Sequence, residues 1–193
     1  MRIHGENEIS RSIDVNQEND YKKYVPQLRE DFKHICGYCG KPEEVTTKGF
    51  EPDHFVPGRI DSSRKLDYSN LVYSCFTCNR KKLGKWPTEN KDKPNDGKVG
   101  FVDPALKEYD THLGRDKEGS IEFYTIVGEY MYKNAFRFDI RPMKEIWKIS
   151  QLINAKENLF EIKDKLTSEE LMKYLELDKA IEELKKILFE KKE

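Results

Sequence analysis

The sequence lacks the features that would place a protein in a membrane or outside the cell. It contains no run of 18 apolar residues, so no segment is predicted to span a bilayer. The first 20 residues are polar and have no apolar core of the kind found in secretory signal peptides. From these two absences we expect a cytoplasmic protein with no membrane partner.

The sequence also lacks a net charge that would point to a class of partner. Charged residues make up 37% of the 193 residues, yet the formal net charge is only −1, which argues neither for nor against nucleic acid. Hydrophobic residues make up 36%, enough for a modest core, and no internal repeat is present. The length predicts one domain, or one small domain with an extension.

The cysteine pattern is the first positive signal. The four cysteines form two Cys-x-x-Cys pairs with none left over: Cys36, Cys39, Cys75 and Cys78. In a reducing cytosol such pairs indicate metal ligands, whereas two disulfides would be the alternative in a secreted chain. Four thiolates complete a tetrahedral Zn²⁺ site and leave no open position, so we expect a structural and not a catalytic zinc ion.

The order of segments predicts a compact motif followed by helices. Residues 1–20 are a polar N-terminal segment that we expect to be mobile, and residues 21–90 are a central domain that holds every strong motif. Residues 91–142 are expected to be a linker with irregular structure and a short strand, and residues 143–193 a helical region. A helix is expected over 21–35 with Pro26 in its first turn, and the short strand around 121–126.

Apolar spacing in the last region predicts two helices. One amphipathic helix is expected to begin near Met143 and to reach Ile162. Thr167 is the expected N-cap of the next helix, and Glu170 completes a capping box. One face of that second helix should carry Leu171, Tyr174, Leu175, Ile181, Leu184 and Leu188. We expect the two helices to pack antiparallel through these stripes, either as plain core or as a partner surface.

Between the cysteine pairs the sequence resembles the HNH endonucleases, in particular their McrA-like branch with a zinc site. The matching residues are Asp53-His54, Val56-Pro57, Asn70-Leu71, Cys75-x-x-Cys78-Asn79 and Lys82. The resemblance implies an α+β fold with a ββα-metal core: a β-hairpin, a loop and a helix that starts near Cys78, held by the four-cysteine zinc site and followed by the helical region.

The resemblance also implies a chemistry for these residues. His54 would be the general base, since a neutral imidazole can accept a proton near neutral pH. Asp53 and Asn79 would hold a divalent cation, and Asn79 would also be the first residue of the helix. Asn70 would fix the loop so that His54 is oriented correctly. Taken alone, His54 could equally be a structural histidine and Asn70 a turn residue.

One residue departs from the commonest family pattern. Many members have histidine directly after the second Cys-x-x-Cys pair, where this chain has Asn79, giving an H-N-N pattern. The HNH domain of the RNA-guided CRISPR effector nuclease has the same variant and resembles this chain in that respect. An amide oxygen is a harder ligand than imidazole, so Mg²⁺ or Mn²⁺ is expected as the catalytic cation.

Positive charge gathers around the motif. Residues 21–90 hold 13 Lys and Arg against 9 Asp and Glu, a local net charge of +4. Duplex DNA, favoured over RNA, would meet these side chains through its phosphates. The candidates are Arg80, Lys81, Lys82, Lys85, Arg59 and Arg64, of which Lys82 and Arg80 are the first choices. A solvated helix face is the alternative for any single lysine.

The sequence after the motif resembles the tail of stand-alone bacterial HNH proteins as far as residue 146. Proteins of that kind often work in anti-phage defence beside an ATPase, as in Septu-type systems, so an ATPase partner is expected by resemblance. Three functions stay open: an active nuclease, a zinc-knuckle module that only binds nucleic acid, and a regulatory or toxin subunit whose nuclease is silent until a partner releases it. The sequence assigns no role to His112.

Overall fold

The structure, a computed structural model, describes residues 1–46, 48–161 and 166–190. The chain divides into two compact units, residues Met1–Arg141 and residues Pro142–Glu193, and each is described by itself. The first unit mixes short helices with small antiparallel sheets, and the second is helical. The expected α+β fold is therefore confirmed.

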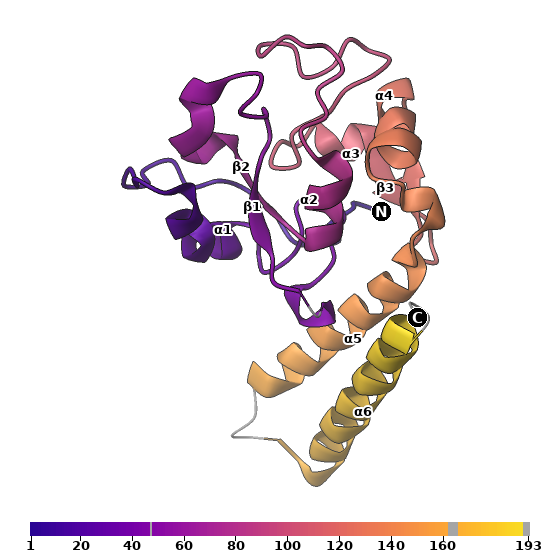
Figure 1. The fold of residues 1–193 in the computed structure, drawn as a ribbon. Coiled ribbons are helices and arrows are strands. Elements are labelled where there is room, and N and C mark those ends of the chain that lie inside the picture. Colours follow the sequence, from indigo (N-terminus) through magenta and orange to yellow (C-terminus); the bar gives the residue numbers. More distant parts are fainter. Residues whose placement is uncertain (47, 162–165, 191–193) are drawn as a thin grey trace. The chain divides into compact units, whose positions relative to one another are not determined.

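The centre of the first unit is a β-hairpin followed by a helix (Figure 1). Strand β1 (Glu51–His54) pairs antiparallel with β2 (Leu71–Ser74), in a register that sets Asp53 against Val72. Helix α2 (Phe76–Lys82) follows β2 directly, with Cys75 between them as its N-cap. It starts two residues earlier than the sequence indicated, so Asn79 lies inside the helix and does not open it.

The N-terminal segment, which we expected to be mobile, packs against the rest of the first unit at several points. Ile3 and His4 are buried, and the first residue pairs with the end of β3 through two backbone hydrogen bonds between Met1 and Arg115. Arg11 makes a two-pronged ion pair with Asp103. The polar composition of residues 1–20 is thus compatible with order because a few apolar and charged side chains find partners on the core.

The expected helix over residues 21–35 is present in part. A 3-10 turn at Tyr21–Tyr24 leads into α1 (Val25–Asp31), with Pro26 in the first turn, where its missing N–H costs no helical hydrogen bond. The helix ends earlier than expected because Lys33 and His34 adopt left-handed backbone conformations. These two residues turn the chain into the first cysteine pair.

The rest of the first unit wraps around this core. The short strand expected near residue 121 is β4, which pairs antiparallel with β3. These elements are β3 (Leu113–Arg115), β4 (Ile121–Phe123), α3 (Tyr109–His112) and α4 (Ile126–Tyr130), with a π-helical turn at Met131–Ala135 and 3-10 turns at Glu43–Val45, Ser62–Leu66, Tyr68–Asn70 and Phe138–Ile140.

The second unit is a pair of antiparallel helices, α5 (Met143–Glu161) and α6 (Ser168–Glu190), that lie side by side (Figure 1). The capping box is confirmed, since Thr167 and Glu170 exchange hydrogen bonds in both directions. The predicted apolar face of α6 is wrong at the start of the helix, because Leu171 and Leu175 are 50% and 53% exposed. Ile162 lies outside the described residues.

No helix in the described ranges is both long and apolar enough to cross a membrane.

Candidate zinc centre and nuclease site

The four cysteines converge on one point in the first unit. All four are buried and none forms a disulfide. Their sulfur atoms lie within 4.8 Å of one another, with 3.9 Å between Cys39 Sγ and Cys75 Sγ. A tetrahedral zinc ion with Zn–S bonds of about 2.3 Å sets its sulfurs about 3.8 Å apart. The cluster therefore fits a structural zinc site.

Local backbone geometry lets the cysteines converge without steric strain. The first pair lies in a knuckle in which the Gly40 N–H donates to the Cys36 carbonyl at 2.8 Å. Gly40 has a φ of +65°, a conformation that favours glycine. A side chain at Gly37 would meet Phe32 and Val72 at less than 3.0 Å, so this position also requires glycine. In the second pair, Cys75 is the N-cap of α2.

Two arginines that the motif did not indicate support the cluster. Arg141 donates to Cys78 Sγ at 3.3 Å and to Cys39 Sγ at 3.6 Å. Burial works against its charge, but the neighbouring thiolates raise the pKa of Arg141 well above its usual value. The guanidinium thereby offsets part of the negative charge of four thiolates. The other, Arg115, is buried and donates to the Cys39 carbonyl at 2.7 Å.

His4 is a buried histidine in contact with the same knuckle. Its Nε2 lies 2.6 Å from the Gly37 carbonyl oxygen, and its ring stacks on Tyr109. Burial lowers the pKa of His4 to about 4, so the ring is neutral near pH 7 and donates its proton to that carbonyl. A lone histidine in a polar segment gave no sequence signal for this role.

His54 is held from two sides at the end of β1. Its Nε2 lies 2.9 Å from the Lys65 carbonyl oxygen, and its ring packs against Tyr21 at a centroid distance of 4.8 Å. A carbonyl oxygen only accepts, so Nε2 carries the proton in the neutral ring. The lone pair of that tautomer is on Nδ1, which is therefore the nitrogen that can accept a proton.

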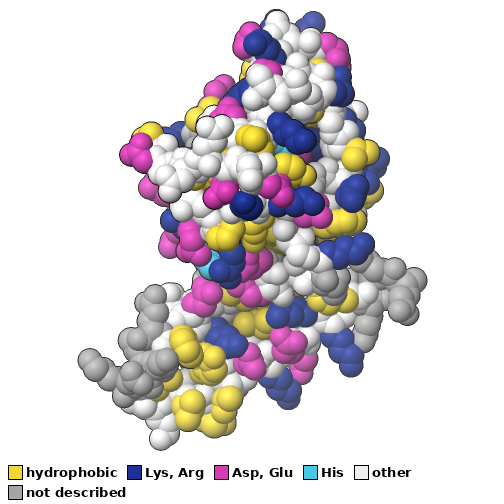
Figure 2. Space-filling model, turned by 60° about the vertical axis from the view of Figure 1, so that its left-hand side comes forward, with side chains coloured by type: hydrophobic (Ala, Val, Ile, Leu, Met, Phe, Trp, Pro, Cys, Tyr) yellow, Lys and Arg dark blue, Asp and Glu magenta, His cyan; other side chains and the backbone are white. Residues whose placement is uncertain are grey.

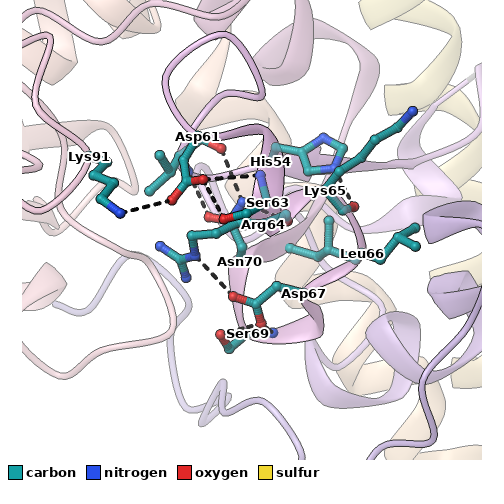
Figure 3. Close-up of polar contacts among 12 residues, drawn as sticks. His54, Asp61, Ser63, Arg64, Lys65, Leu66, Asp67, Ser69, Asn70 and Lys91 are labelled. Atoms are coloured by element: carbon teal, nitrogen blue, oxygen red, sulfur yellow. Dashed lines mark hydrogen bonds and ion pairs between the residues drawn. The ribbon is translucent and has the colours of Figure 1, made fainter.

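The loop between the strands keeps the Lys65 carbonyl in place (Figure 3). Asp61 and Asp67 each cap a 3-10 turn through a side-chain oxygen. Asn70 closes the loop: its Oδ1 accepts from the Val56 N–H at 2.8 Å, and its amide nitrogen donates to the Val56 carbonyl at 3.0 Å. These contacts are the ones that the expected loop-holding role of Asn70 requires.

Asp53 points to the opposite side of β1, into the protein. Its Oδ2 accepts a hydrogen bond from the Tyr38 hydroxyl at 2.5 Å and lies 3.0 Å from Lys82 Nζ. The ammonium of Lys82 also donates to the His54 carbonyl at 2.7 Å. Lys82 thus joins α2 to the strand that carries both motif residues. Neither contact of Asp53 uses Oδ1.

Asn79 faces the same side of the hairpin as Asp53. Its amide nitrogen donates to Glu51 Oε2 at 2.8 Å, and Glu51 lies two residues before Asp53 on β1. Residues two apart on a strand share a face, so the two acidic side chains and Asn79 gather between β1 and α2. Because Glu51 fixes the nitrogen of the amide, Asn79 Oδ1 is turned away from Glu51.

Burial contradicts one of the expected phosphate contacts. Lys82, a first choice for contact with DNA, is fully buried and cannot reach a phosphate from that position. Three others have partners: Arg59 pairs with Glu89, Arg64 with Asp67, and Lys85 donates to the Asn134 carbonyl. Arg80 and Lys81 remain, with no carboxylate partner among the described residues. On the face drawn in Figure 2, cationic and acidic side chains are interspersed.

The site contains three side chains to which the sequence assigned no role inside it: Tyr38, Glu51 and Lys82, a motif residue that was expected to contact phosphate. A signal existed for two of them. Glu51 alternates with Asp53 on a predicted strand, and Lys82 follows Asn79 by three residues on a predicted helix, so each shares a face with a motif residue. Tyr38 had no signal beyond its place between two cysteines.

Comparison with known proteins identifies the class of this site. Residues 36–84, about a quarter of the chain, match the family model described as HNH endonuclease. No curated protein matches the chain, and no solved structure does. Together with the cysteine cluster, the match shows that these residues form an HNH endonuclease domain with a site for a structural metal ion. HNH endonucleases are nucleases that act on DNA.

Proposed function

We propose that this protein is a metal-dependent endonuclease that hydrolyses phosphodiester bonds in DNA. The observation that carries the proposal is the contact of His54 Nε2 with the Lys65 carbonyl, because it leaves Nδ1 as a proton acceptor. A module that only binds nucleic acid has no need of a histidine whose tautomer is fixed in this way.

His54 would act as the general base. Nδ1 takes a proton from a water molecule, whose oxygen forms a bond to phosphorus while the bond from phosphorus to the 3′ oxygen breaks. The Lys65 carbonyl then stabilises the imidazolium, since it already accepts the Nε2 proton. The leaving oxygen takes a proton from solvent, and Nδ1 gives its proton back to solvent, which completes the hydrolysis and restores the neutral base.

Asp53 and Asn79 would hold the divalent cation. Their oxygens are hard donors of the kind that Mg²⁺ and Mn²⁺ prefer, and both side chains face the space between β1 and α2. A cation bound there would act as a Lewis acid on the phosphate and the leaving oxygen. Lys82 and Glu51 would orient the two ligands and would not contact the substrate.

We expect the purified protein to convert supercoiled plasmid to nicked or linear DNA in Mg²⁺ or Mn²⁺. Cleavage should stop when EDTA is present and return when Mg²⁺ is added in excess, because the proposed cation site is open and the cysteine site is closed. Gel electrophoresis of the plasmid measures this. Binding of DNA without cleavage in either metal would favour the module that only binds nucleic acid, or a nuclease subunit that is inactive until a partner releases it.

Charge-removing changes at Arg80 and Lys81 should weaken DNA binding without altering any sequence preference. Each lost phosphate contact should reduce the slope of log K against log salt by about 0.9 on duplex DNA. Binding is measured over a salt series with a His54→Ala protein, which is not expected to cut. The matched control is Lys173→Ala, which removes an exposed lysine on α6. An equal slope change in the control would show that the loss is not local to α2.

Two expectations from the sequence stay predictions. One is the cytoplasmic location, and the other is a role in anti-phage defence beside an ATPase. The second depends on the resemblance to stand-alone bacterial HNH proteins. Copurification of an ATPase with the tagged protein from its native cells would test it.

A further inference from the structure

Tyr38 is the residue that links the cysteine cluster to the candidate cation site. It is the third residue of the knuckle Cys36-Gly37-Tyr38-Cys39, and its side chain is fully buried. Its ring packs on Phe136 at a centroid distance of 4.7 Å, and its carbonyl accepts from the Tyr109 hydroxyl at 2.7 Å. The knuckle and its neighbours therefore determine where the Tyr38 hydroxyl lies.

That hydroxyl reaches the carboxylate that would bind the cation. It donates to Asp53 Oδ2 at 2.5 Å, and the same oxygen lies 3.0 Å from Lys82 Nζ. The last torsion of an aspartate has a broad energy well, so an ammonium alone does not fix the rotation of a carboxylate. The Tyr38 hydroxyl is a second, directional donor to Oδ2, so it defines the rotation of the Asp53 carboxylate and keeps Oδ1 out of both contacts.

We propose that Tyr38 is a positioning residue through which the zinc knuckle sets the orientation of Asp53 for the catalytic cation. The proposal rests on the proposed function in that it takes Asp53 as a ligand. A ligand held in its binding geometry loses less conformational freedom when the cation arrives, so the hydroxyl raises the affinity of the site. Without it, the carboxylate can turn both oxygens toward Lys82.

The test is Mn²⁺ binding to zinc-loaded protein, measured by electron paramagnetic resonance or calorimetry. Tyr38→Phe keeps the ring and removes only the hydroxyl. We expect it to weaken Mn²⁺ binding about tenfold, the scale of one lost positioning contact. Zinc content and the thermal midpoint should stay near those of the unchanged protein, because the ring still packs on Phe136.

Tyr68→Phe is the matched control. The Tyr68 hydroxyl also donates to a buried aspartate, Asp31 Oδ2, at 2.6 Å, and Asp31 is not part of the proposed site. We expect its Mn²⁺ affinity to be unchanged. Equal affinities for Tyr38→Phe and the unchanged protein would overturn the proposal, as would equal losses in the two variants.

A double-mutant cycle separates positioning from a general disturbance of the knuckle. In an Asp53→Asn background, Tyr38→Phe should cause no further loss of Mn²⁺ affinity, because the hydroxyl acts only through the carboxylate. The same loss in both backgrounds would overturn the proposal. Its failure is distinct from that of the proposed function, since plasmid cleavage with an unchanged Mn²⁺ affinity in Tyr38→Phe removes only the role of Tyr38.

Discussion

His54→Ala is expected to lower the rate of DNA cleavage by about 10² to 10⁴, the usual effect of losing a general base. The imidazole contacts the Lys65 carbonyl and the Tyr21 ring, and the fold does not depend on either contact. Zinc content and the thermal midpoint should therefore change little. The measurement is the rate of plasmid nicking at saturating Mn²⁺, with both structural readouts recorded on the same preparation.

His34→Ala is the control for this variant. His34 is another partly exposed histidine of the first unit, but it contacts Glu30 and Glu43 and not the hairpin loop. Its activity should stay close to that of the unchanged protein. If a folded, zinc-loaded His54→Ala protein cuts DNA at the unchanged rate, His54 is not the base and the proposed mechanism is wrong.

The parts of the fold that the sequence predicted correctly are set by local rules. A Cys-x-x-Cys pair needs only a tight turn, and Gly40, directly after the first pair, supplies the required backbone conformation. The capping box at Thr167 and Glu170 is likewise a contact within one helical turn. Contacts of this kind depend on neighbours in the sequence, so the residue pattern alone identifies them.

The parts that the sequence did not predict depend on tertiary contacts. Lys82 was expected to contact DNA phosphate, yet Asp53 and the His54 carbonyl give its ammonium two partners inside the protein. Lysine is almost never fully buried without such partners. Residues 1–20 were expected to be mobile because they are polar, yet Ile3 and Arg11 find partners far away in the sequence, at Arg115 and Asp103. No local pattern reports such partners.

The same limit applies to the candidate site. The motif indicated His54, Asp53 and Asn79, and the structure brings Asp53 and Asn79 to one side of β1 and His54 to the other. How each is held depends on Lys65 and Tyr38, whose relevant atoms are a backbone carbonyl and a phenol hydroxyl. A backbone carbonyl carries no residue identity, so no sequence pattern could have assigned its role.

Cys78→Ser is expected to unfold the first unit under conditions in which the unchanged protein is stable. A structural zinc ion contributes on the order of 10 kcal/mol to a small fold, whereas whole domains are stable by about 5–15 kcal/mol. The same change removes one of the two sulfur acceptors of Arg141. A partly buried guanidinium that has lost part of its compensating charge adds a further cost.

The matched control for this variant is Ser74→Ala, which changes a fully buried residue beside the cluster and leaves all four sulfurs. Losing its weak hydroxyl contact should cost about 1 kcal/mol and leave one zinc ion per chain. Elemental analysis compares the zinc content of the two variants, and thermal unfolding compares their stability. Two outcomes would contradict the zinc assignment: a Cys78→Ser protein that melts like the control, or an unchanged protein whose cysteines are oxidised and free of metal. In either case a zinc ion bound by the four sulfurs would not be holding the hairpin and α2 together.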